Sequence, residues 1–200
     1  QGTLGMGRFF APEAMFGVAK GVLRTTVGYA RAPKENTVTD FSSADHIEVT
    51  RIEYDPRETT FKELLKLFWR NHDPTQNSGI AKYTSAIFCH DDVQEIEANQ
   101  SIEEHREMYS VPIVTKILKL GEFNAAEMPH QKYMLQRYKA LCGHLFPSGL
   151  QDASRSHVAT RLNGYLGGYG TVAAFDAESD QLGLPAYQIN WVRFMINELS

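Results

Sequence analysis

The sequence is poor in the features that mark several common classes of protein. It has only two cysteines, Cys89 and Cys142, which excludes a framework of several disulfides. The two could form one disulfide, but we favour the interpretation that both are small buried residues. No apolar run approaches the ~20 residues of a membrane helix. A net charge of −4 favours neither a nucleic-acid nor a membrane-surface partner. Because no phosphate-binding glycine loop and no metal-ligand histidine spacing is present, we expect no cofactor and no metal.

What the chain does have is the composition of an ordinary folded protein. Its 200 residues are 42% hydrophobic and 22% charged, which predicts a single domain spanning residues 1–200 with a sizeable core. The chain starts at Gln1 rather than Met, so a processed or trimmed form is one interpretation. A soluble protein, either cytoplasmic or secreted after processing, fits this composition, and the oligomeric state stays open.

The order of hydrophobic patterns predicts a mixed α and β architecture. β-branched or alternating segments predict strands, and segments with apolar residues at helical spacing or with capping signals predict helices. The expected strands are 3–7, 22–29, 46–55, 85–89 and 111–118, and the expected helices begin at residue 12 and at 61, 91, 127, 154 and 172. This order is typical of an α+β fold, a two-layer roll or plait with a helical C-terminal extension.

Several short motifs occur in an order that carries further information. Residues 7–13 read GRFFAPE, and residues 21–29 read GVLRTTVGY. HIEV at 46–49, YDP at 54–56, LFWRNHDPT at 67–75, YTS at 83–85, AE at 126–127 and HQKY at 130–133 follow. The run resembles the peptide methionine sulfoxide reductase A family over most of the chain, and residues 156–168 resemble a C-terminal portion of animal members.

The resemblance implies a cysteine nucleophile where this chain has Arg8. In the family that thiolate attacks the sulfoxide sulfur, and a resolving cysteine near the C-terminus then forms a disulfide. Residues 189–200 contain no cysteine, and neither cysteine of this chain lies at a family resolving position. By resemblance, therefore, both halves of the thiol chemistry are absent.

The resemblance also assigns a substrate pocket. Phe9 and Phe10 stand where the family has a Phe-Trp pair around the substrate methyl group, Glu48 matches its acid, and Tyr83 matches one of its oxygen-binding tyrosines. The family's second tyrosine aligns with residues 36–38 of this chain, and a family aspartate aligns with residues 77–79. This chain has neither residue at those positions, unless Asp40 or Asp73 takes a compensating place. The predicted ligand pocket consists of Arg8, Phe9, Phe10, Glu48, Tyr83 and His130, and for His130 we favour a structural hydrogen-bonding role.

Arg8 has two interpretations at the start of the first helix. It can form an ion pair with Glu48 and fill the pocket, which we favour, or it can bind an anion together with helix N–H groups. Phe9 and Phe10 can hold a methionine-like group or serve only as core residues.

Three functional hypotheses follow. The first is a redox-inactive member of the family whose altered cleft binds a peptide, a small anion or a protein partner. The second is an enzyme with non-thiol chemistry that uses Arg8, Glu48 and Tyr83. The third is an engineered or variant peptide-methionine (S)-S-oxide reductase. No residue is a certain catalytic group.

Overall fold

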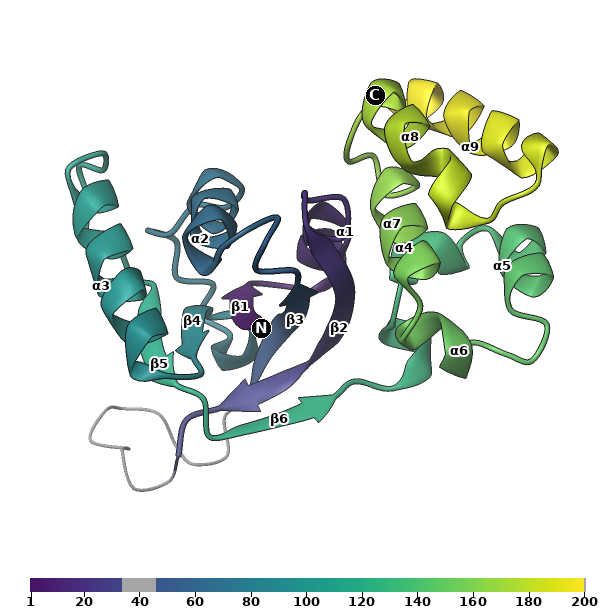
Figure 1. Cartoon of the computed structure of the whole chain (residues 1–200). Coiled ribbons are helices and arrows are strands. Elements are labelled where there is room, and N and C mark those ends of the chain that lie inside the picture. Colours follow the sequence, from purple (N-terminus) through teal and green to yellow (C-terminus); the bar gives the residue numbers. More distant parts are fainter. Residues whose placement is uncertain (34–45, 200) are drawn as a thin grey trace.

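A single mixed sheet forms the centre of the N-terminal part of the protein (Figure 1). The structure is a computed structural model, and it describes residues 1–33 and 46–199. The six strands lie in the order β5-β4-β1-β3-β2-β6. They span β1 Gly2–Met6, β2 Val22–Arg31, β3 Ile47–Tyr54, β4 Ser85–Cys89, β5 Lys116–Lys119 and β6 Glu122–Ala125. All neighbours are antiparallel except β4 and β5, which are parallel.

Three helices and a short turn accompany this sheet. They are α1 Phe10–Gly17, α2 Phe61–Arg70, the 3-10 helix η2 Ala81–Tyr83 and α3 Asp92–Arg106. Thr60 is the N-cap residue of α2, and its hydroxyl accepts the Glu63 N–H; the helix buries one apolar face. That face, with Phe68 at 0% exposure, joins residues of α1, β1, β3 and β4 in the main core.

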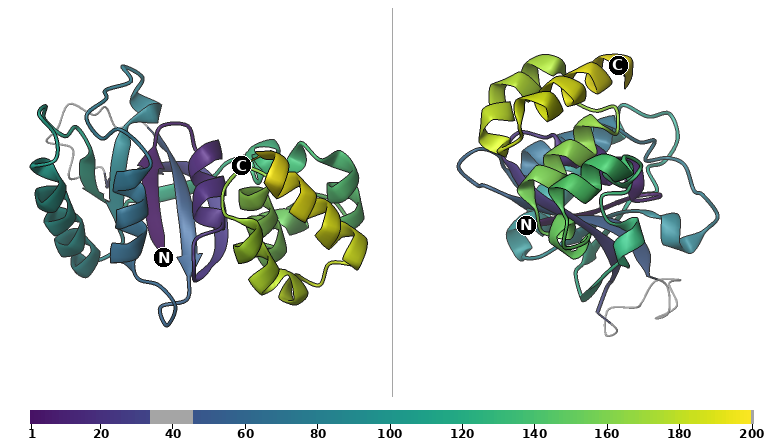
Figure 2. Two further views of the ribbon diagram at one scale, coloured as in Figure 1. Left: turned by 90° about the horizontal axis from the view of Figure 1, so that it is seen from above. Right: turned by 90° about the vertical axis from the view of Figure 1, so that its right-hand side faces the viewer.

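The C-terminal third is helical and lies beside α1 and β2, as the left view of Figure 2 shows. Its elements are η3 Met128–His130, α4 Tyr133–Gln136, α5 Lys139–Leu145, α6 Gln151–Ser154, α7 His157–Tyr165, α8 Val172–Glu178, η4 Ser179–Leu182 and α9 Ala186–Leu199. It has its own core, which includes Tyr165 and Phe175. Among residues 1–33 and 46–199, no helix is long and apolar enough to cross a membrane.

Helices α1 and α7 approach each other closely because glycine lines the contact. A Cβ on Gly17 would lie 2.6 Å from the Thr160 carbonyl oxygen, and one on Gly164 would lie 2.5 Å from the Ala14 carbonyl oxygen. These carbon–oxygen distances are shorter than van der Waals contact, so helices α1 and α7 can cross this closely only with glycine at both positions. The helical part is thereby packed against the helix that follows Arg8.

The α+β roll with a helical extension is confirmed, and several details were wrong or missed. The strand expected over 111–118 begins only at Lys116, and both β6 and α9 were missed. The helix expected from residue 127 is divided into η3, α4 and α5. Pro129 lies in its first turn, and Lys132 has a φ of 51°, which ends a right-handed helix. The predictions for residues 36–38 and Asp40 lie outside the described residues.

Candidate functional site

Arg8 lies in the tight turn between β1 and α1. Gly7 precedes it with a φ of +83°, a conformation that favours glycine, and Phe9 is the N-cap residue of α1. The Arg8 side chain is exposed, and its guanidinium carbon lies 5.2 Å from the centre of the Tyr83 ring. This is cation–π distance, so Arg8 lies over a half-buried aromatic face.

Glu48 does not pair with Arg8, contrary to our prediction. Glu48 is 6% exposed, and its carboxylate accepts the Phe9 N–H at 3.4 Å and lies 3.7 Å from the Lys82 Nζ. Within residues 1–33 and 46–199, Lys82 is the cation beside Glu48. Lys82 comes from η2, which packs against β3, and its flexible stem reaches the carboxylate, while Arg8 lies exposed over the Tyr83 ring.

The predicted aromatic wall does form. Phe9 is buried and Phe10 half-buried, with ring centres 5.0 Å apart, and each ring centre lies 5.9 Å from that of His130. Tyr133, which the sequence reasoning missed, stacks on Phe10 at 4.3 Å and is 43% exposed. The wall is therefore accessible at the exposed Tyr133 ring and at the half-buried Phe10 ring.

Tyr29 is a second residue that the sequence reasoning missed as part of the site. It is paired directly with Glu48 across β2 and β3, and its ring centre lies 5.8 Å from that of Phe9. Burial, then the negative charges of Glu127 and Glu48, raise the pKa of the Tyr29 phenol. Tyr29 is therefore a neutral hydroxyl donor at ordinary pH.

A hollow of about 280 Å³ lies beside Arg8 and Tyr83. Its other lining residues are Met6, Gly7, His72, Asp73, Gln76, Ser78 and Ser85. The His72 Nδ1 lies 2.7 Å from the Phe68 carbonyl oxygen, so Nδ1 carries the proton, and Nε2 lies 2.7 Å from the Ser85 hydroxyl. Burial lowers the pKa of His72, which keeps the ring neutral.

The segment 77–79, which aligns with the missing aspartate, and Asp73, which was considered as its substitute, have different surroundings. Ser78 lies on the hollow, but its hydroxyl is engaged with the backbone of Ile80. Asp73 also lines the hollow, and its Oδ1 accepts both the N–H and the hydroxyl of Thr75, at 2.9 and 2.6 Å. These bonds lower the pKa of Asp73, so the hollow contains one ionised carboxylate that already has partners.

A buried ion pair holds α1 to the segment that carries His130. Glu13, in the first turn of α1, and Lys132 are both 0% exposed, and the Lys132 Nζ lies 2.7 Å from the Glu13 Oε1. The Lys132 N–H donates to the other carboxylate oxygen at 2.8 Å, and the Thr25 hydroxyl donates to Oε1 at 3.2 Å. Motif spacing alone gave no sign that these residues, 119 positions apart, would meet.

Both cysteines are free and buried. Burial raises the pKa of the Cys89 thiol to about 12 and raises that of Cys142 as well. Cys89 ends β4 beside the start of β1, whereas Ser85 pairs with Met6 at the Arg8 end, so the Cys89 backbone lies roughly 13 Å from that end of the strand. Among the described residues, no group of three His, Cys, Asp or Glu side chains could hold a metal ion.

Comparison with known proteins agrees with this arrangement. Residues 1–162 match the family model of peptide methionine sulfoxide reductase, and residues 149–197 match the helical domain of selenoprotein methionine sulfoxide reductase A. This chain belongs to the peptide methionine sulfoxide reductase family. A Drosophila melanogaster member is 41% identical over 200 residues, which cover 98% of this chain and 80% of that protein.

Solved structures of family members share the fold. Mxr1 from Saccharomyces cerevisiae in reduced form has a TM-score of 0.60 and 27% identity, over 68% of this chain and 84% of that one. Mxr1 in complex with Trx2 has a TM-score of 0.51 and 29% identity, over 63% of this chain and 79% of that one. The relatives that match in sequence are named as peptide methionine sulfoxide reductases.

Proposed function

We propose that this chain is a redox-inactive member of the family that binds a peptide side chain of the methionine sulfoxide type. The observation that carries the proposal is the exposed Arg8 guanidinium in the turn before α1, where the resemblance calls for a thiolate. A guanidinium stays protonated and cannot attack sulfur.

The remaining thiols support the same conclusion. Cys89 and Cys142 are the only cysteines of the whole chain. With a pKa of about 12, Cys89 has roughly one thiolate in 10⁵ molecules at pH 7, and it lies at the wrong end of β4. Cys142 lies in α5 of the helical part.

The surroundings of Arg8 favour a ligand with an apolar end and an acceptor oxygen. The accessible rings of Phe10 and Tyr133 suit a methyl or methylene group. The Tyr29 and Tyr83 hydroxyls and the Arg8 guanidinium are donors for an oxygen such as that of a sulfoxide. A small anion would use Arg8 but would leave the aromatic wall unused.

Fluorescence polarisation with two labelled peptides that differ only in methionine or methionine sulfoxide tests the proposal. We expect the sulfoxide peptide to bind more tightly, and we expect Arg8→Met and Phe10→Ala each to weaken it. Arg106→Met, at an exposed ion pair on α3, is the matched control and leaves binding unchanged. Equal binding of both peptides, or no effect of Phe10→Ala, would contradict the proposed site.

A non-thiol enzyme is the second candidate, favoured by the exposure of Arg8. Arg8 and Tyr83 are in contact, but Glu48 is buried and already bonded to the Phe9 N–H and close to Lys82. The three residues thus meet only in part. Conversion of the sulfoxide peptide, without any added reductant, to a product of the same overall oxidation state, abolished by Glu48→Gln, would favour this candidate.

A further inference from the structure

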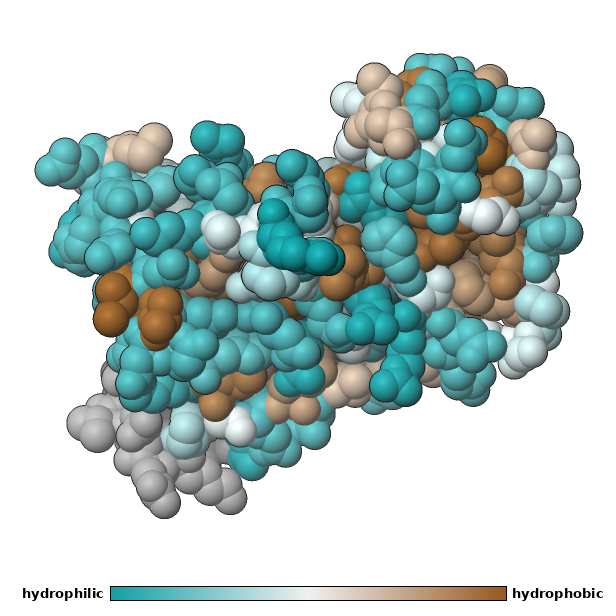
Figure 3. Space-filling view, in the orientation of Figure 1, coloured by the Kyte–Doolittle hydropathy of each residue, from teal (hydrophilic) through white to brown (hydrophobic). Residues whose placement is uncertain are grey.

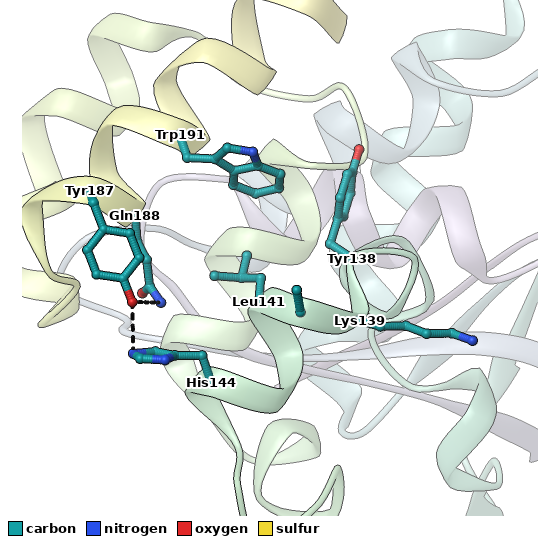
Figure 4. Close-up of a pocket in the computed structure, with 8 residues that line it drawn as sticks. Tyr138, Lys139, Leu141, His144, Tyr187, Gln188 and Trp191 are labelled. Carbon is teal, nitrogen blue, oxygen red and sulfur yellow. Dashed lines mark hydrogen bonds between the residues drawn. The ribbon is translucent and has the colours of Figure 1, made fainter.

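The helical part of the protein reaches the Arg8 site through one short segment. Its large cavity, about 530 Å³ between α5 and α9, is lined by rings such as Tyr187 and Trp191 and shares no residue with that site (Figure 4). In Figure 3, brown apolar residues gather on the surface of these C-terminal helices. The residues that do touch the site are His130 and Tyr133, from η3 and α4. The position of residues 128–136 therefore decides what the helical part contributes to the Arg8 site.

Two links join this segment to α1, one exposed and one buried. The exposed link is the stack of Tyr133 on Phe10, whose ring centres lie 4.3 Å apart. The buried link is the ion pair of Lys132 and Glu13, with 2.7 Å between Nζ and Oε1. Phe10 and Glu13 are three residues apart in α1 and so lie on the same side of that helix, and Lys132 directly precedes Tyr133. The buried pair thus sets the spacing between the two segments that carry the stacked rings.

The residues before Tyr133 are also bonded to the sheet. The Lys132 Nζ donates to the Thr25 carbonyl oxygen of β2 at 2.7 Å, in addition to its bond with Glu13. The Gln131 Nε2 donates to the Val27 carbonyl oxygen at 2.8 Å, and its Oε1 accepts the Val27 N–H at 3.0 Å. Both side chains are buried. The chain that leads into Tyr133 is therefore fixed against α1 and β2 together.

The backbone of Lys132 is strained. Its φ of 51° lies in the left-handed region, and among residues 1–33 and 46–199 no other residue except glycine has a positive φ. A lysine adopts this conformation at a cost, and such conformations persist where the surroundings impose them, often at ligand sites. Lys132 is the N-cap residue of α4, so this turn sets the direction in which the Tyr133 side chain leaves the backbone.

We infer that Lys132 is a positioning residue of the Arg8 site. Its buried ammonium and its left-handed backbone hold Tyr133 against Phe10, and so form the aromatic face that the apolar end of the ligand contacts. Lys132 is 0% exposed, so it touches no ligand and its effect on binding passes through Tyr133. The role in binding rests on the proposed function, whereas the role in placing Tyr133 holds with or without a ligand.

Fluorine NMR of the protein labelled with 3-fluorotyrosine tests the placement of Tyr133 without a ligand. The Tyr133 signal is identified by its loss in Tyr133→Phe. We expect Lys132→Met to move this signal toward its position in the denatured protein, because the ring leaves the Phe10 stack. Lys66→Met, at an exposed ion pair on α2, is the matched control and leaves the signal unchanged. An unchanged Tyr133 signal in a folded Lys132→Met protein would overturn the inference.

A second variant covers the case in which Lys132→Met does not fold. The double variant Glu13→Gln, Lys132→Met breaks the same link without leaving a buried charge, and circular dichroism confirms its folding. The same displacement of the Tyr133 signal is expected, and a native signal would again overturn the inference.

Fluorescence polarisation with the methionine sulfoxide peptide tests the role in binding through a double-mutant cycle. We expect Tyr133→Ala to weaken binding by roughly two- to tenfold, the range of an aromatic contact, and Lys132→Met to weaken it by a similar factor. In the Tyr133→Ala background, Lys132→Met has no further effect, because the ring through which it acts is gone. A merely structural role would multiply the two losses, and that result would overturn the inference.

The same titrations separate this inference from the proposed function. No binding of the sulfoxide peptide to the wild-type protein would refute the proposed function and, with it, the role of Lys132 in binding. Binding by the wild-type protein, with losses that multiply in the double variant, would refute only the role assigned to Lys132.

Discussion

The buried pair of Glu13 and Lys132 gives the sharpest stability prediction. Lys132→Met keeps the side-chain length and the left-handed backbone at this position but removes the charge. The buried Glu13 carboxylate, 0% exposed, then loses its counter-ion. It keeps only two donors, the Thr25 hydroxyl and the backbone N–H at position 132. Breaking a buried ion pair on one side costs about 3–5 kcal/mol.

For a chain of this size, each kcal/mol lowers the melting temperature by about 2–4 °C. The loss therefore corresponds to a decrease of roughly 6–20 °C, measured by circular dichroism. Lys66→Met, which breaks the exposed pair with Glu63, is the matched control and changes stability by no more than about 0.5 kcal/mol.

Adding Glu13→Gln to Lys132→Met recovers part of the loss, because the unpaired charge is removed as well. The reasoning is refuted if Lys132→Met melts within a few degrees of the Lys66→Met control. It is equally refuted if the double variant is less stable by the sum of the two single losses.

Three further predictions concern thiols, pH and cooperativity. We expect Cys89 and Cys142 to react negligibly with a thiol reagent in the native protein at pH 8, because burial raises the pKa of both thiols. Both react at once in denaturant. Rapid labelling of the native protein would contradict this. Burial lowers the pKa of His72 below 6.5, so the unfolded state binds more protons, and stability to urea decreases as the pH falls below about 6.5. His72→Asn reduces that slope, and an unchanged slope would exclude this residue as a source. If residues 1–200 form one domain, Trp69 in the main core and Trp191 in the helical part report the same urea midpoint in single-tryptophan variants, and two midpoints would show two units.

Local signals in the sequence were sufficient for much of the fold. The alternation of β3 and the spacing of Phe61, Leu64, Leu65 and Phe68 in α2 predicted elements close to those observed. Strand β6 has only four residues, none of them fully buried, so it has no hydrophobic pattern to recognise. Its position depends on pairing with β2, a long-range contact that periodicity does not encode.

The proximity of the candidate residues was predictable but their pairing was not, and their role in a ligand site stays a prediction. Motif order placed Arg8, Phe9, Phe10, Glu48, Tyr83 and His130 together, and the structure brings them to one end of the sheet around α1 and η2. Lys82 rather than Arg8 lies beside Glu48 because of the direction that the Arg8 side chain takes after the turn at Gly7, which has a positive φ. Sequence motifs do not specify that direction. Tyr29 lies next to Glu48 because of the register in which β2 pairs with β3. The two strands are joined by a long connection, and the sequence alone does not set their register.

Reduction of a methionine sulfoxide peptide with dithiothreitol as the reductant tests the central claim most directly. The wild-type protein and Arg8→Cys are compared at equal concentration, with methionine measured by mass spectrometry. The account predicts no methionine from the wild-type protein, and at least one equivalent from Arg8→Cys if the rest of the site still holds substrate. Repeated turnover by the wild-type protein, at the rate of a cysteine-containing relative, would contradict the account.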